Sequence, residues 1–172
     1  MRRAVGRITC AWVAVLCSCR ASADSQTGGT AHVHISITGG GDTVGFRIPI
    51  RARRCGDGHG VVLDGGQHGN GLLVWLRSGV GSPDSGTYSL LSRGDSAAPR
   101  GAITSVRYII GTVAHGIIVD SGTATLARER PPYAVHVKGN GAEVAIPGRR
   151  SVELTADNVP LESDTVNCAV QL

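Results

Sequence analysis

The sequence predicts an all-β fold, an antiparallel β-sandwich or barrel of about nine to eleven short strands, preceded by a signal peptide. Three observations support this prediction. Apolar and polar residues alternate over short stretches, which is the period of a half-buried strand. Turn sequences rich in glycine, of which the chain has 25, separate these stretches at spacings of roughly 8 to 15 residues. No stretch shows a sustained helical period between capping residues.

The first expected strand illustrates the pattern, because Val33, Ile35 and Ile37 share one face while His32 and His34 share the other. The run 72–76 is continuously apolar, which indicates a strand buried on both faces and places Trp75 in the core. The expected strands span residues 31–38, 44–50, 72–76, 88–90, 103–110, 117–119, 123–126, 133–138, 144–146, 152–154 and 166–170.

The connections between these strands carry turn residues. Residues 56–71 are expected to form a Gly-rich loop, and Asp120-Ser121-Gly122 and Gly139-Asn140-Gly141 to form tight turns. The segment 84–88 resembles the tyrosine-corner sequence of immunoglobulin variable domains, which predicts a tight turn before Tyr88. No internal repeat of fixed period is present, so residues 31–172 are expected to form a single β domain.

The first 23 residues have the three parts of a secretory signal peptide. Three arginines precede residue 8, residues 8–16 are apolar, and Ala21-Ser22-Ala23 forms a small-residue cleavage site before Asp24. The apolar run is shorter than the ~20 residues that a membrane-spanning helix needs. The chain is therefore expected to be exported.

A second processing route is open. Leu16-Cys17-Ser18-Cys19 resembles a bacterial lipoprotein signal, which implies a signal of residues 1–18 and lipidation of Cys19. Residues 24–30 are then expected to act as a flexible tether. We favour the lipid-anchored form over cleavage before Asp24, and either route leads to a membrane-anchored or a periplasmic or extracellular protein.

The charge distribution argues against nucleic-acid binding. The formal charge is +4, but four of the 17 basic residues lie before residue 24, and all 13 acidic residues lie at or after it. The body of the chain is therefore neutral, with 13 basic and 13 acidic side chains. A neutral body lacks the electrostatic term that dominates nucleic-acid affinity.

Two cysteines lie outside the leader, Cys55 and Cys168. An even pair in an exported protein predicts a disulfide, here between an early strand and the last one. Two buried free thiols are the alternative.

One segment resembles a catalytic loop. The run from Ile117 to Ala124 places Asp120-Ser121-Gly122-Thr123 after apolar residues, as in the aspartic proteases. The resemblance implies a homodimeric, retroviral-type protease in which Asp120 of each copy shares one proton. Only some fifty residues follow Asp120, whereas that family places this loop early in the domain, and Asp-Ser-Gly is also ordinary turn chemistry.

Histidines suggest a metal site as a further alternative. His32 and His34 are expected on one side of a strand, and His59 and His68 in the Gly-rich loop with Asp57 and Asp64. Zinc needs three or four converging ligands, and none of the familiar ligand spacings is present. Polar side chains on an exposed strand face are the simpler interpretation.

The second half of the chain resembles small bacterial exported lipoproteins with a β-sandwich domain. Gly86-Thr87-Tyr88, Asp120-Ser121-Gly122 and residues 135–139 carry the resemblance. It implies a β domain of the cell envelope without a catalytic site. The expected function is accordingly non-enzymatic: binding of an envelope partner or ligand, or a structural role, with no cofactor and with membrane contact only through an N-terminal lipid.

Overall fold

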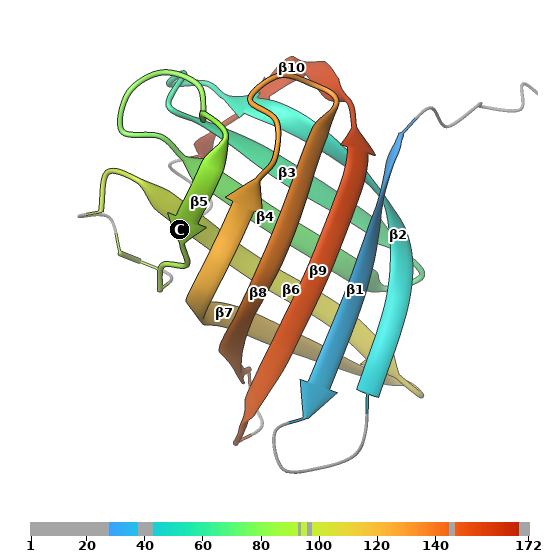
Figure 1. Ribbon diagram of the computed structural model, residues 1–172. Coiled ribbons are helices and arrows are strands. Elements are labelled where there is room, and N and C mark those ends of the chain that lie inside the picture. The colour runs from blue at the N-terminus through green and yellow to red at the C-terminus, as the bar shows by residue number, and fades with distance from the viewer. Residues whose placement is uncertain (1–27, 38–42, 93, 96–97, 145–146, 169–172) are drawn as a thin grey trace, which may run out of the picture.

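The computed structural model describes residues 28–37, 43–92, 94–95, 98–144 and 147–168. This part of the chain forms ten β-strands (Figure 1). The strands are β1 (Gly29–Ile37), β2 (Thr43–Cys55), β3 (Gly60–Gln67), β4 (Asn70–Arg77), β5 (Gly86–Ser89), β6 (Gly101–Ile110), β7 (Val113–Leu126), β8 (Tyr133–Glu143), β9 (Arg149–Val159) and β10 (Leu161–Val166).

Eight of the strands close into an antiparallel barrel. Their hydrogen-bonded order is β1-β9-β8-β7-β6-β4-β3-β2, and β2 pairs back onto β1. Closure removes the free edges that an open sheet of this size leaves. The predicted all-β antiparallel fold is confirmed, and of its two forms the structure has the barrel.

The two longest strands, β7 and β2, each pair with two different strands along the same edge. The first part of β7 pairs with β6, and residues 123–126 pair with β5. In the same way, residues 43–50 of β2 pair with β1, and the strand then continues beside β10. β5 and β10 therefore extend the wall at the end that carries the β2–β3 and β7–β8 connections, which we call the upper end (Figure 1). The opposite, lower end carries the β3–β4, β6–β7 and β8–β9 connections.

The barrel interior is filled by side chains. β8 shows the rule, since Tyr133, Val135 and Val137 are buried whereas His136 and Lys138 are exposed. Fully burying one large apolar side chain stabilises the fold by roughly 1.5–3 kcal/mol. The largest fully buried apolar side chains of this core include Ile35, Ile48, Leu63, Leu76, Tyr88, Tyr108, Ile117, Leu126 and Leu154.

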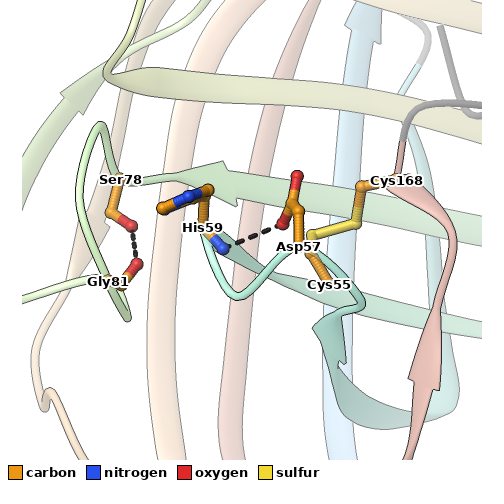
Figure 2. The surroundings of a disulfide bond; sticks show 6 residues. All are labelled: Cys55, Asp57, His59, Ser78, Gly81 and Cys168. Carbon is orange, nitrogen blue, oxygen red and sulfur yellow. Dashed lines mark hydrogen bonds between the residues drawn. A yellow bond between two sulfur atoms is a disulfide. The ribbon is translucent and has the colours of Figure 1, made fainter.

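A disulfide fastens the C-terminal segment to the outside of the wall. Cys55 ends β2 and Cys168 follows β10, with their Cα atoms 5.5 Å apart in the bonded pair (Figure 2). The two cysteines pack with Val62, Trp75 and Ile103 in a second, smaller cluster. The predicted pairing is present, and Trp75 is buried as expected but in this outer cluster instead of the barrel core.

The prediction of tight turns at 120–122 and 139–141 is wrong. Both segments lie in the middle of strands, β7 and β8, and they face each other across that strand pair. A register shift between Val119 and Ser121 leaves Asp120 as the extra residue of a β-bulge. Bulges bend a strand and increase its twist, which a closing barrel needs.

Glycine is required at this bend because the two backbones touch. Gly122 has a φ of 117°, and a Cβ there would lie 2.2 Å from the Lys138 carbonyl oxygen. A Cβ at Gly139 would lie 2.3 Å from the Ser121 carbonyl oxygen. Gly122 and Gly139, whose residue type predicted turns, instead allow the backbones of β7 and β8 to come into contact.

Two further boundaries differ from expectation. The predicted Gly-rich loop 56–71 contains all of β3 and the start of β4, which form a hairpin. β1 begins at Gly29, inside the expected tether of residues 24–30. Residues 1–27, and with them the leader and Cys19, lie outside the described residues.

The turn before Tyr88 is present. The Tyr88 hydroxyl donates to the Asp84 carbonyl oxygen at 2.6 Å, and burial raises the pKa of Tyr88 to about 12. The Arg100 guanidinium lies over the Tyr88 ring, 4.4 Å from its centroid, and pairs with the Asp84 carboxylate at 2.8 Å. This arrangement holds the β4–β5 connection against the barrel.

Candidate functional site

The histidines proposed as metal ligands do not converge. His32 and His34 lie on the outer side of β1, and His59 and His68 lie at opposite ends of β3. At about 3.3 Å per residue, the length of β3 separates His59 from His68 by more than 20 Å. No group of three or more His, Cys, Asp or Glu side chains among the described residues is placed to hold a metal ion.

The neighbouring acidic residues have other partners. Asp57 accepts a hydrogen bond from the backbone N–H of His59 at 2.8 Å (Figure 2). Asp64 is paired with Arg53 at 3.0 Å and with Arg51 at 3.6 Å. These residues were expected to cluster because they are close along the chain. The extended strand β3 instead places them far apart on the barrel wall.

Asp120 is an ion-pair partner on the outer surface. Its carboxylate accepts from both terminal nitrogens of Arg149, which also contacts the Ser121 hydroxyl. The Arg149 guanidinium, ahead of other effects, holds the pKa of Asp120 below its usual range. A carboxyl that shares a proton with a second carboxyl needs the opposite shift in one member of the pair. The arrangement favours a structural role at the bulge.

A buried polar cluster that the sequence did not predict closes the lower end of the barrel. It consists of Tyr108 on β6, His115 on β7, Glu143 on β8 and Arg150 on β9, which are four adjacent strands. The side chain of Glu143 is 0% exposed, and those of His115 and Arg150 are 13% exposed. Charged groups are rarely buried this deeply unless they are paired.

Each carboxylate oxygen of Glu143 lies against a nitrogen of the cluster, although Glu143 Oε2 and Arg150 Nε make no hydrogen bond within the described residues. Glu143 contacts His115 Nδ1 through Oε1 and Arg150 Nη2 through Oε2, each at 2.5 Å. The Tyr108 and His115 rings stack with centroids 5.0 Å apart, and burial raises the pKa of Tyr108. Because Glu143 bonds Nδ1, it fixes the orientation of the His115 imidazole.

An open groove of about 610 Å³ begins beside this cluster and runs over the outer face of the wall. Its volume falls within the roughly 300–1,000 Å³ that is typical of small-molecule sites. His115 belongs to both the groove and the buried cluster. The residues lining it are Gly65, Gly71, Leu72, Leu73, Ser105, Val106, Arg107, Ala114, His115, Gly116, Ile117, Ile118 and Val144.

Two cross-strand rows form the outward-facing part of the groove. In the first, Arg107 lies between Gly71 on β4 and Gly116 on β7. In the second row, Ser105 lies between Leu73 and Ile118. Each of these residues is two positions along its strand from a residue of the first row, so both rows lie on the same face. The first row is open on both sides of Arg107 because Gly71 and Gly116 have no side chains, and in the second row Leu73 and Ile118 supply apolar walls.

Large apolar side chains are exposed around the same end of the barrel. Ile110 and Val113 flank the β6–β7 turn, and Val144 follows β8; their exposed fractions are 46%, 55% and 54%. Of the four large apolar residues that are exposed in the described part of the chain, only Val80 lies elsewhere, in the β4–β5 connection. A local gathering of exposed apolar residues is a feature of binding surfaces.

One sequence signal for this site was available. The inward alternation of Tyr133, Val135 and Val137 on β8 continues, two residues at a time, to Glu143. A carboxylate at an inward position needs cationic partners. Which cations those are depends on strand order, which the sequence does not reveal.

In comparisons with known proteins, no family model, no curated protein and no solved structure matches this chain. The described residues include no helix with the length and hydropathy required to cross a membrane.

Proposed function

We propose that this chain is an exported, non-enzymatic binding protein whose β-barrel takes up a small, largely apolar ligand in the outer groove. The observation that carries the proposal is the groove itself, which is open at Gly71 and Gly116 and has Leu73, Ile118 and Val144 as apolar surface. Concave, mainly apolar sites with a few polar groups are the usual form of small-ligand sites. Within the described residues, the inward-facing apolar side chains pack into one buried cluster.

The buried cluster supports this proposal as a rigid base for the groove. Glu143 contacts both His115 and Arg150, and of these cluster residues His115, on β7, lines the groove. Binding sites need side chains held by neighbouring contacts, since a loosely held site loses affinity. The cluster thus orders β7, which carries Gly116, and the end of β8, which Val144 follows.

The test fills the groove and asks whether apolar binding is lost. A Cβ at Gly116 would have only Val144 nearby, at 3.8 Å, so Gly116→Leu places a side chain in the groove without a backbone clash. We expect Nile red, an uncharged dye that fluoresces in apolar surroundings, to bind the unmodified protein and not Gly116→Leu. The matched control is Gly56→Leu at the upper end, where a Cβ would have only the Val166 carbonyl oxygen nearby, at 3.8 Å. Equal dye binding by all three proteins would contradict the proposal.

Export and anchoring belong to the proposal and need a separate measurement. Support comes from the leader, with its apolar run, the Ala21-Ser22-Ala23 site and Cys19. The intact mass of the protein from its host distinguishes the routes: a chain that begins at Cys19 with added acyl groups is lipid-anchored, and one that begins at Asp24 is released. A full-length mass that includes residue 1 would contradict export by either route.

A further inference from the structure

We infer that the ligand of the groove is a small amphipathic carboxylate, whose negatively charged head binds Arg107 and whose apolar body lies along Leu73, Ile118 and Val144. This inference rests on the proposed function, because it names the ligand class of the same groove. It adds a binding residue, Arg107, and a charge requirement.

The acidic side chains on the neighbouring strands are already bound by cations. Asp64, which lies opposite Leu73, is held by Arg53 and Arg51. Glu143 is held by His115 and Arg150, and Asp120 by Arg149. That leaves the groove with a cationic side chain of its own, Arg107, which makes no ion pair within the part of the chain that the structure describes.

The position of Arg107 makes its guanidinium available to a ligand. Both of its cross-strand neighbours are glycines, Gly71 and Gly116, so no side chain flanks it on either adjacent strand. Ser105 lies two residues away on the same face and adds a hydroxyl donor. A planar guanidinium beside a hydroxyl suits a carboxylate, which can accept two parallel hydrogen bonds.

The apolar part of the ligand follows from the second row. Leu73 and Ile118 flank Ser105, and Val144, which follows β8, adds exposed apolar surface. A groove of about 610 Å³ accepts a free small molecule. A membrane surface would bind an apolar patch surrounded by several cations, whereas this groove contains a single arginine. These features favour a soluble carboxylate with an alkyl chain as its apolar part.

The experiment compares two probes that differ only in the head group, decanoate and decanol, by titration calorimetry against the purified protein. We expect decanoate to bind at least tenfold more tightly than decanol at low salt, and this difference to shrink as salt is added. Arg107→Gln should remove the difference and leave decanol binding unchanged. The matched control is Arg128→Gln, since Arg128 is exposed in the β7–β8 connection at the upper end, and it should bind both probes as the unmodified protein does.

The outcomes separate the inference from the proposed function. If decanoate and decanol bind equally and both are lost in Gly116→Leu, the groove is a small-ligand site but the carboxylate assignment is wrong. If neither probe binds, both statements are wrong. If light scattering shows a concentration-dependent dimer that Val144→Ser abolishes, a second copy covers the groove, and the ligand assignment is again overturned.

Discussion

Removing the charge of Glu143 is expected to be among the most damaging single substitutions in this protein. The side chain is 0% exposed and contacts one cation or imidazole through each oxygen. Glu143→Gln keeps the size of the side chain but leaves Arg150, which is 13% exposed, without its counter-charge. An uncompensated buried charge costs roughly 3–5 kcal/mol.

That cost is large compared with the roughly 5–15 kcal/mol that stabilises a typical domain. It corresponds to a decrease in Tm of roughly 6–20 °C, at roughly 2–4 °C per kcal/mol for a chain of this length. The assay is urea unfolding followed by circular dichroism, with thermal unfolding as a second measurement. The matched control is Glu153→Gln, because Glu153 pairs with His136 on the surface and is 56% exposed. An exposed pair contributes less than about 1 kcal/mol.

A double substitution tests whether the cost arises from the unpaired charge. Glu143→Leu combined with Arg150→Met removes both charges and keeps the volume, so it should be much less damaging than Glu143→Gln alone. The reasoning is refuted if Glu143→Gln changes the free energy of unfolding no more than Glu153→Gln does. It is also refuted if the double variant is less stable than Glu143→Gln.

Three further predictions concern the rest of the fold. Reducing the Cys55–Cys168 bond should add two hydrogens to the intact mass. It should also destabilise the protein by up to about 4.7 kcal/mol, which is the chain-entropy estimate for a loop of ~100 residues. An unchanged mass would mean that the two thiols are free. For Asp120, the folded-state pKa is lowered, so its ion pair stabilises the protein above the unfolded-state pKa of about 3.9 and that contribution is lost as pH falls through the folded-state value. The Tm difference between the unmodified protein and Asp120→Asn should therefore be present at pH 7 and shrink progressively as the pH falls below about 3.9, and a difference independent of pH would contradict the pairing. Gly122→Ala should destabilise the protein by roughly 1–3 kcal/mol from backbone strain, and the clash with the Lys138 carbonyl should add to this cost. Gly58 also has a positive φ but has open space around it, so Gly58→Ala should show the cost of strain alone.

Strand periodicity predicted the fold class because it is local. In β8, alternation alone gives the inward face, and the structure agrees from Tyr133 to Val137. The prediction failed where one residue type serves two purposes. Gly122 and Gly139 have the sequence of turn residues, yet they lie inside strands because closure of the barrel brings β7 and β8 into backbone contact there.

The candidate site was beyond prediction for a related reason. The sequence places Arg107 and Gly116 nine positions apart, and Gly71 much further away, with no motif in common. They form one row only because β4, β6 and β7 are neighbours in the barrel and have this register. The disulfide could be predicted despite a sequence separation of 113 residues, because outside the leader each cysteine has a single possible partner.

The sharing of β2 and β7 between two partners also decides how this protein resists self-association. Closure pairs both sides of the eight-stranded wall, so within the described residues the backbone groups still available for pairing lie along the two supplementary strands. β5 has four residues and β10 has six, and the second of these is followed by the disulfide at Cys168. Short, tethered edges are poor templates for intermolecular strand addition, which is the first step of amyloid-like aggregation. The protein should accordingly resist fibril formation while the bond is intact, and its tendency to form fibrils should rise when reduction removes the covalent tether and leaves β10 held to β2 by backbone pairing alone.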